Sequence, residues 1–393
     1  MGYRQHWGCR QLNGLQFIRK HLECKLIING GFVVIGQRLK LARAAAGLSL
    51  RDLQAQIGNR VTAQAIGKYE RNESMPSSGV LIALCAALGV TEDYLLGDQE
   101  LVLEGVEFRK KTITSQREEA QVQAQVLHLF ERYLMVEELL GLSVEWDKPR
   151  EAPYPIHNEN EAENAAAGLR AHWGLGSDPI PSLVELLEER GIKVLSIKAD
   201  KIDGLTAQVR RPNRPGLPVI VINSTDWGER KRFNLAHELG HMVVEVGQHV
   251  DAERVAHRFA GAFLMPADAL RGEVGKHRTS ISLAELARLK KIFGASFQAI
   301  TYRCKDLGIF SDALFRMLFN EFTRRGWRSP PYQEAGALPA KLEEPSRLKA
   351  LCYRAVAEGA ISESRAAELL GISVHELNRR MDDPEAEGNV TEV

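Results

Sequence analysis

The chain has 393 residues, of which 44% are hydrophobic and 26% charged, and its 51 Lys and Arg residues balance 51 Asp and Glu residues. This length predicts two or three globular domains, and the zero net charge gives no support for a nucleic-acid partner without excluding one, because a local basic face is sufficient. No apolar run reaches the roughly 18 residues that cross a bilayer, and no apolar region with a cleavage site follows the N-terminus, so we expect neither a membrane span nor a signal peptide.

The first hundred residues divide into two parts. Residues 1–33 show no clear periodicity, and we expect a disordered extension, or a segment that precedes a true translation start near Val34. Residues 34–97 instead predict five short helices with apolar faces. Capping side chains and terminating glycines delimit these helices: Ser49, Thr62, Thr91, Gly47, Gly58 and Gly89.

The segment from 35 to 97 resembles the Cro/C1-type (XRE) helix-turn-helix family. The resemblance is carried by the stretches SLRDLQAQIG, QAIGKYERNESMP and LIALCAALGVTEDYLL, with Glu70 where the family has a glutamate after the recognition helix. It implies that the third helix enters the major groove of a double-stranded DNA operator. It also implies a homodimer, because such domains usually bind two half-sites.

The expected DNA contacts lie on and around the recognition helix: Thr62, Ala63, Gln64, Gly67 and Lys68, together with Arg51, Arg60 and Arg71. Gln64 could pair with adenine and Lys68 with guanine or phosphate, while Arg38 and Arg43 are further candidates for phosphate contacts. Two features depart from the family: Leu50 replaces a common glutamine, and the turn at residues 59–61 is long. A small helical protein-binding module is the alternative interpretation.

Residues 98–158 are charged and predict a helical linker, with one long helix from about 114 to 140. Its apolar positions recur at helical spacing, as expected for a surface or inter-domain helix. We take this helix as the candidate dimer interface. Prolines at positions 149, 153 and 155 mark the end of the linker.

The remaining chain predicts a mixed domain followed by helices. Residues 159–310 contain helical patterns near 160–172, 182–191, 229–246 and 251–263, and two strand-like runs, IKVLSI and LPVIVIN, separated by a Gly/Pro-rich turn. Residues 311–393 predict a helical regulatory region with a disordered tail; a helix–turn–helix rhythm around Gly371 is expected to pack on the body of the protein or to mediate regulation. The predicted fold class is mainly α with a small β-sheet (α+β). An N-terminal five-helix domain precedes a domain with the sequence HELGH at residues 237–241, an HExxH pattern that makes a zincin-like domain the expectation.

A candidate zinc site lies in the sequence His237-Glu238-Leu239-Gly240-His241. Residues four apart share one face of a helix, so both imidazoles can bind one ion while Glu238 lies beside it as a general base. Zinc would supply an activated water and polarise a scissile carbonyl. The alternative is an amphipathic helix with two ordinary histidines.

A catalytic zinc site needs a third protein ligand as well as an open position. The segment after the motif offers Glu253 and His257, which are four residues apart, and His249 as a weaker candidate in the loop. Spacing alone does not choose among them. The five cysteines form no CxxC pair, which argues against a cysteine-ligated zinc and a disulfide framework and makes a reducing cytoplasm the simplest compartment.

Residues 160–310 resemble the ImmA/IrrE family of zinc metallopeptidases. The matching stretches include Ile180-Pro181, EERGI, Asp203-Gly204, VIVIN, RFNLAHELGHMV and ERVAHRFAGAFLMP. The family pattern E-x-x-A-N-x-F-A implies that Glu253 is the third zinc ligand. The family's asparagine is His257 in this chain, which places a second potential ligand on the same helical face.

Together these features predict a transcriptional regulator that joins operator binding to a zinc metallo-endopeptidase domain. Family members are associated with the cleavage of XRE-type repressors, so the peptide substrate would be such a repressor or the chain itself. Two alternatives remain: a repressor whose metal domain is a non-catalytic sensor or interaction module, and the antitoxin of a toxin–antitoxin pair.

Overall fold

The computed structural model describes residues 35–96, 101–110, 115–142, 144–198, 202–211, 214–329 and 334–383. The predicted extension 1–33 and the final residues of the predicted tail lie outside the described residues. The described residues form two compact units: one holds 35–96 with 115–128, and the other holds 101–110 with the described residues from 129 to 383. In the described parts of the chain, no helix is long and apolar enough to cross a membrane.

The first unit contains the five predicted helices, which are confirmed: α2 (Gly36–Ala45), α3 (Leu50–Gln56), α4 (Ala63–Glu70), α5 (Ser78–Leu88) and α6 (Glu92–Leu95). The predicted caps form as well. The side chains of Ser49, Thr62 and Thr91 accept hydrogen bonds from backbone amides in the first turns of α3, α4 and α6. These side chains satisfy amides that the helices cannot pair internally.

A buried apolar cluster holds the five helices together, with Leu39, Leu53, Ile66 and Leu84 almost fully buried. The predicted long helix is α7 (Gln116–Leu139), and its first half belongs to this unit. There, the Gln125 side chain donates to the carbonyl oxygen of Ala45 at 3.2 Å.

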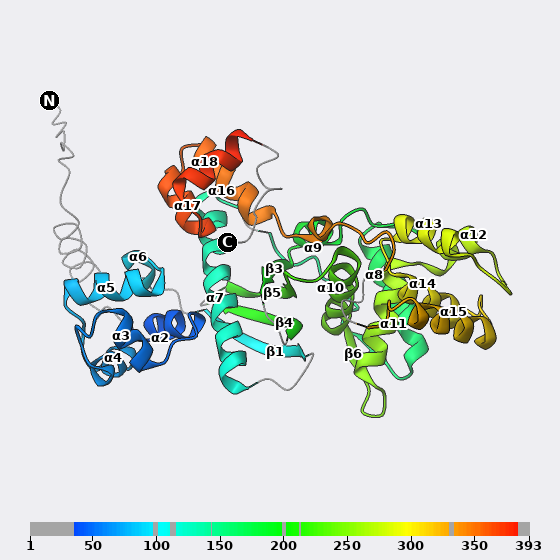
Figure 1. The fold of residues 1–393 in the computed structure, drawn as a ribbon, viewed down its shortest axis with the longest axis horizontal. Helices are drawn as coiled ribbons and strands as arrows, with labels where there is room; N and C mark the ends of the chain where they lie inside the picture. The colour runs from blue at the N-terminus through cyan, green and yellow to red at the C-terminus, as the bar shows by residue number, and fades with distance from the viewer. Residues whose placement is uncertain are drawn as a thin grey trace. The chain divides into compact units, whose positions relative to one another are not determined.

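The second unit is built on a four-stranded sheet in the order β1-β4-β5-β3 (Figure 1). Its strands are β1 (Val102–Lys110), β3 (Lys193–Ile197), β4 (Ile202–Arg211) and β5 (Arg214–Asn223). Strands β3 and β5 are parallel, whereas β4 is antiparallel to both β5 and β1. A second small sheet pairs β2 (Tyr154–Ile156) with β6 (Val244–Val246).

The sheet corrects the sequence analysis in two places. The helical linker predicted over 98–158 contains α7 but also strands β1 and β2, and β1 completes the sheet of the second unit. The Gly/Pro-rich turn between the two predicted strands is instead part of a hairpin made by β4 and β5. A strand is stabilised mainly by pairing with neighbours that are distant in sequence, so its own residues indicate it weakly.

The second unit also contains the following helices: α8 (Ala162–His172), α9 (Leu183–Glu189), α10 (Gly228–Val243), α11 (Ala252–Leu264), α12 (Ala267–Val274), α13 (Leu283–Phe293), α14 (Phe297–Asp306), α15 (Asp312–Arg324), α16 (Arg347–Ala357), α17 (Glu363–Leu370) and α18 (Val374–Asp382), with 3-10 helices η1 (Glu159–Glu161) and η2 (Ala340–Glu343). The predicted fold class, mainly α with a small sheet, is confirmed. The helix predicted to reach Val246 ends at Val243, because the next three residues form β6.

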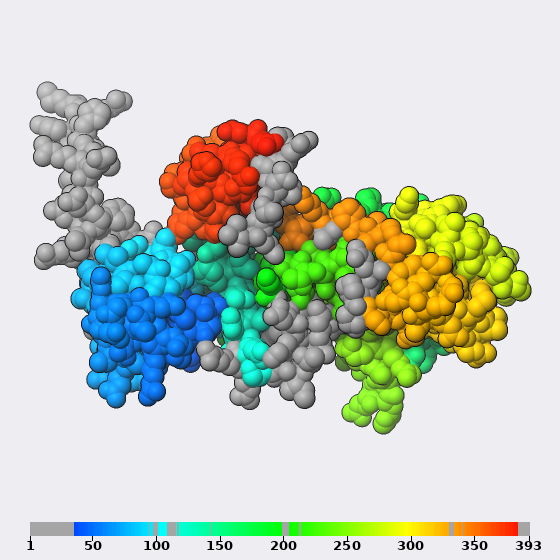
Figure 2. All heavy atoms as spheres, in the orientation of Figure 1, coloured from blue at the N-terminus to red at the C-terminus, as the bar shows by residue number. Residues whose placement is uncertain are grey.

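The C-terminal helices form a compact lobe (red in Figure 2). The helix–turn–helix rhythm around Gly371 is confirmed, with Gly371 in a left-handed conformation between α17 and α18. Arg365 of α17 donates to the sulfur of Met135 on α7 at 3.0 Å. This segment therefore packs on the body of the second unit.

A buried ion pair fixes helix α10 within this unit. Arg232 of α10 and Glu343 of η2 are almost fully buried, and their charged groups are 2.6 Å apart. The Glu343 carboxylate also accepts hydrogen bonds from the backbone amides at the start of α9, those of Leu183 and Val184. One pair of charges thus joins three helices.

The second half of α7 meets the sheet through another buried polar cluster. Lys193 of β3 donates to Glu137 of α7 at 2.5 Å, with Tyr133 and Glu188 close by. Burial raises the pKa of the Glu188 carboxyl to about 7, because desolvation outweighs the nearby positive charges.

The Glu188 carboxyl predicts a dependence of stability on pH. Its folded-state pKa of about 7 lies above the ordinary value of 4.5, so the folded protein holds a proton that the unfolded chain releases as pH rises through this window. Folding therefore loses stability between pH 4.5 and 7, by about 3 kcal/mol. In Glu188→Gln this loss should disappear, as measured by urea unfolding at pH 5 and pH 8.

The neighbouring exposed carboxylate supplies the control, since Glu189→Gln should keep the pH dependence of the wild type. Equal pH dependence in Glu188→Gln and the wild type would contradict the assignment.

Candidate functional site

The HExxH motif lies in the second half of α10, where the sequence predicted a helix. Leu235, Leu239 and Val243 bury one side of this helix in the core. His237 and Glu238 are also buried, while His241 retains partial exposure. The motif is therefore held on a rigid element at the edge of the core.

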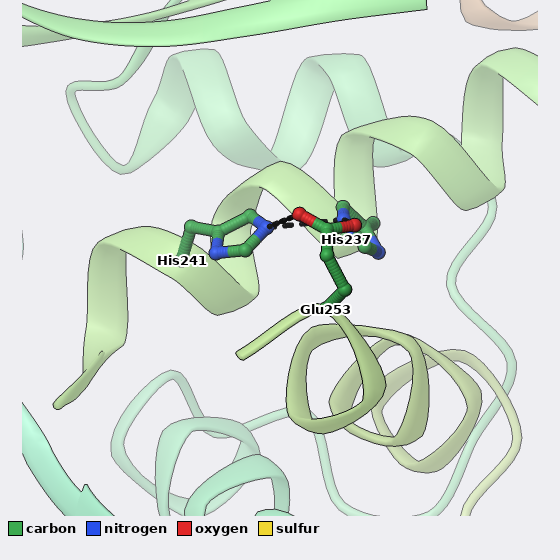
Figure 3. Close-up of side chains that lie close together, drawn as sticks. All are labelled: His237, His241 and Glu253. Atoms are coloured by element: carbon green, nitrogen blue, oxygen red, sulfur yellow. Dashed lines mark hydrogen bonds and ion pairs between the residues drawn. The ribbon is translucent and has the colours of Figure 1, made fainter. Parts of the chain in front are cut away.

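The two histidines and Glu253 form a compact triangle of donor atoms. The Nε2 atoms of His237 and His241 are 3.0 Å apart, and the Glu253 carboxylate oxygens lie 3.3 Å from the first and 3.4 Å from the second. Figure 3 shows the carboxylate reaching from α11 to the two imidazoles of α10. Among the described residues, these three form the group that could hold a metal ion.

The triangle fits a zinc ion in both chemistry and size. Two imidazole nitrogens and one carboxylate form a common ligand set of catalytic zinc sites, with bond lengths of about 2.0–2.2 Å. In tetrahedral coordination such bonds place the ligand atoms about 3.3 Å apart, close to the three observed separations. Three protein ligands also leave the fourth position for a water or substrate.

The other candidates for a third ligand lie outside the triangle. The His257 Nδ1 atom donates to the backbone carbonyl oxygen of Glu253 at 2.7 Å, and its ring lies edge-on to His237 with centroids 4.5 Å apart. His257 is thus a neighbour of one candidate ligand. His249 is exposed in the loop after β6 and is not part of the donor group.

Two neighbours of the motif come from the sheet. A Cβ atom at Gly204 of β4 would lie 2.9 Å from the Val221 carbonyl oxygen and 3.5 Å from Glu238 Oε1, so β4 approaches the candidate general base closely. On β1, Glu107 Oε2 lies 4.0 Å from His241 Nδ1. Glu107 belongs to no sequence motif, and its place near His241 depends on the pairing of β1, so the sequence alone does not predict it.

A cavity of about 370 Å³ lies next to His257, the neighbour of His237. Phe233 and Asn234 of α10 line it together with His257 and Tyr302. Phe233 and Asn234 precede His237 by four and three residues, so they share its helical face. A volume of this size can accept a side chain of a bound peptide.

The cysteines that the structure describes take no part in the candidate metal site. Cys85, Cys304 and Cys352 are free and buried. Burial raises the pKa of the first two to about 12 and of the third to about 11. Such thiols stay protonated at neutral pH and are poor metal ligands.

The predicted recognition helix α4 exposes some of its predicted DNA contacts and buries one. Thr62, Gln64 and Lys68 are exposed, and Ala63 is half-buried. Gly67 is buried, and a Cβ atom there would lie 3.6 Å from Leu50. Gly67 is therefore largely covered by its own domain, and its contact with a base stays a prediction.

The start of α4 is fixed by a residue that the sequence analysis missed. Gln54 of α3 accepts a hydrogen bond from the Ala63 amide at 2.9 Å and donates to the Asn59 side chain at 3.1 Å. It thereby anchors the long turn, in which Gly58 and Asn59 both have positive φ angles.

The arginines around α4 differ in their exposure and in the partners that they already bind. Arg51 and Arg60 are exposed, and Arg71 is exposed but forms an ion pair with Glu73. Arg43 is bound to Glu70 and to the Leu48 carbonyl oxygen. Arg38 donates to the Tyr94 carbonyl oxygen at 2.6 Å. Arg43 and Arg38 thus stabilise the domain itself, so they are weaker candidates for phosphate contacts than Arg51 and Arg60.

Comparison with known families assigns both regions. Residues 39–95 match the family described as Helix-turn-helix, and residues 187–305 match the family described as IrrE N-terminal-like domain. No curated protein matches the chain. The chain thus joins an XRE-type helix-turn-helix domain, of a DNA-binding kind, to a metallopeptidase-like domain of the ImmA/IrrE type, and both resemblances are confirmed.

The donor triangle predicts the effect of removing each candidate ligand. Glu253→Ala should weaken zinc binding by more than about 100-fold, because a direct ligand contributes more than an outer partner. His257→Ala should weaken it less, by no more than the roughly 10–100-fold loss typical of an outer partner, and His249→Ala should have no effect. Competition with a chromophoric chelator measures these affinities; a greater loss in His257→Ala than in Glu253→Ala would assign the ligand to His257.

The exposed face of α4 predicts base reading by Gln64. Gln64→Ala should weaken binding to a duplex selected from a random pool by about 1–3 kcal/mol, with little change for a shuffled duplex. Fluorescence anisotropy measures both, and Gln56→Ala, an exposed glutamine of α3, is the matched control. Equal losses on both duplexes would contradict base reading and indicate a backbone contact.

Proposed function

We propose that this chain is a transcriptional regulator that binds operator DNA through its helix-turn-helix domain and acts as a zinc metallo-endopeptidase through its second domain. The substrate would be an XRE-type repressor or the chain itself. The observation that carries the enzymatic part is the triangle of His237, His241 and Glu253, with Glu238 next to the first ligand.

The residues of the site have distinct proposed roles. His237, His241 and Glu253 would hold the ion, and when bound zinc would supply an acidified water and an electrophile for the scissile carbonyl. Glu238 would accept the proton of the attacking water and pass it to the leaving amine. Glu238 is buried, and a side chain at Gly204 of β4 would begin 3.5 Å from its Oε1 atom, so glycine at this position leaves room for the carboxylate.

The DNA-binding part rests on the exposed face of α4. Gln64 and Lys68 would read the major groove, while Arg51, Arg60 and Arg71 would bind phosphates. Two copies of the domain would bind two half-sites. The apolar face of α7, which the sequence offered as a dimer interface, is buried within one chain at Val122, Val126 and Val136, so the proposed dimer would need another surface. A cytoplasmic location would suit both functions.

Replacing the proposed general base separates catalysis from DNA binding. Glu238→Gln should keep zinc and DNA affinity but reduce cleavage by about 100-fold or more, since a positioned general base contributes about 10²–10⁴-fold. The measurements are metal analysis, anisotropy with DNA, and incubation with XRE-type repressors encoded nearby. Glu245→Gln, an exposed carboxylate just after the helix, is the control.

A different result would favour another function. If the wild type binds zinc but cleaves neither itself nor a repressor, and Glu238→Gln regulates its promoter normally, the enzymatic proposal fails. The metal domain would then be a sensor or interaction module, or part of an antitoxin.

A further inference from the structure

Strand β1 covers the edge of the sheet that lies beside the donor triangle. In the sheet order β1-β4-β5-β3, β4 would be the outer strand on this side if β1 were removed (Figure 1). Strand β4 is also the one that approaches Glu238 at Gly204. The backbone edge next to the proposed general base is therefore already paired.

The register of β1 places it along the site. Arg109 pairs with Gly204, and Glu107 pairs with Thr206. Directly paired residues of antiparallel strands point to the same face, and the Glu107 carboxylate accordingly lies 4.0 Å from His241 Nδ1. The end of β1 thus pairs with the part of β4 that approaches Glu238, and Glu107 lies near the motif helix.

An extended peptide commonly binds a protein by adding a strand to an open sheet edge. Backbone hydrogen bonds hold such a peptide with little dependence on its sequence, and alternate side chains enter the site. Strand β1 has this arrangement, being extended, antiparallel to β4 and outermost in the sheet. Residues 102–110 also lie outside the matched family segment 187–305.

We infer that the β4 edge is the peptide-binding edge of the metallopeptidase site and that β1 occupies it in cis, so that a substrate peptide must displace β1. This inference rests on the proposed peptidase function and adds the regulation of that site. Its occupant is a defined segment of this chain, residues 102–110.

The pairing of β1 is interrupted, as displacement requires. Its register with β4 shifts between Glu104 and Glu107 and again between Arg109 and Lys110. Gly105, within the first irregularity, has a φ of +60°. Glu104, Gly105 and Glu107 are exposed, so little apolar burial holds the middle of the strand in place.

A reversible lock tests the inference. Glu104 and Gln208 are directly paired and exposed, a geometry that a disulfide can span, so E104C/Q208C would fix β1 on β4 under oxidation. A second variant, Leu103→Pro/Glu104→Pro, is designed to release β1 from β4 and is called the released variant. Amides alternate sides along a strand, so one of the two successive prolines removes an amide that faces β4. The probe is a fluorescent peptide of residues 101–110, and anisotropy reports its binding to the full chain in a Glu238→Gln background.

The released variant should bind the peptide at least about tenfold more tightly than the unreleased chain, because an intramolecular strand competes at a high effective concentration. The oxidised lock should bind none, and reduction with a phosphine should restore the binding of the unreleased chain. Glu104→Cys alone should not respond to oxidation. Equal binding in the oxidised and reduced lock would overturn the inference, as would a folded, released variant that fails to bind.

Measurements of cleavage separate the proposed role of β1 from the proposed peptidase activity. With Glu238 intact, oxidation of the lock should slow cleavage of a repressor at least about tenfold. Cleavage that is equal in both redox states would overturn the role of β1 and leave the peptidase standing. Peptide binding to the released variant without any cleavage by the wild type would support the occupied edge and refute the peptidase.

Discussion

The placement of the candidate metal-binding residues depends on the buried charge pair of Arg232 and Glu343. Transferring two charges from water to the protein interior costs several kcal/mol for each ion, which only close pairing and full hydrogen bonding offset. Glu343 meets this requirement through Arg232 and two amides at the start of α9. Since Arg232 precedes His237 by five residues on α10, a short 3-10 helix more than a hundred residues away constrains the HExxH helix. The constraint is stringent because either charge alone would be strongly destabilising.

The parts predicted from sequence are those specified by neighbours in the chain. The helices of the first unit were predicted by Ser49, Thr62 and Thr91, whose hydrogen bonds reach only three residues ahead. The HExxH spacing likewise predicts a shared face from helix geometry alone. In contrast, β1 and β4 depend on each other across about a hundred residues, and no local pattern records their pairing. The roles of Glu343 and Gln54 depend on the same kind of distant contact.

The candidate third ligand shows where local spacing stops being informative. Glu253 and His257 are one helical turn apart on α11, and both lie near α10. Helical periodicity alone therefore could not decide which of them is the third ligand. The structure distinguishes them by the direction of their polar atoms. The Glu253 carboxylate faces both imidazoles, whereas the His257 Nδ1 atom turns back to a carbonyl of its own helix. The replacement of the family's asparagine by His257 therefore alters the surroundings of the triangle, including one wall of the neighbouring cavity.

The path of the chain between the two units has a consequence of its own. The chain leaves the first unit after α6, contributes β1 to the second unit, returns for residues 115–128 and then leaves again. The first half of α7 is thus bound to the helix-turn-helix helices by contacts such as that of Gln125 with Ala45. A break in the backbone within residues 101–110 would remove the covalent link to those helices while leaving these contacts intact. The two fragments would then associate according to mass action. Dilution, or a competitor for the surface of α7, would determine how long they stay together.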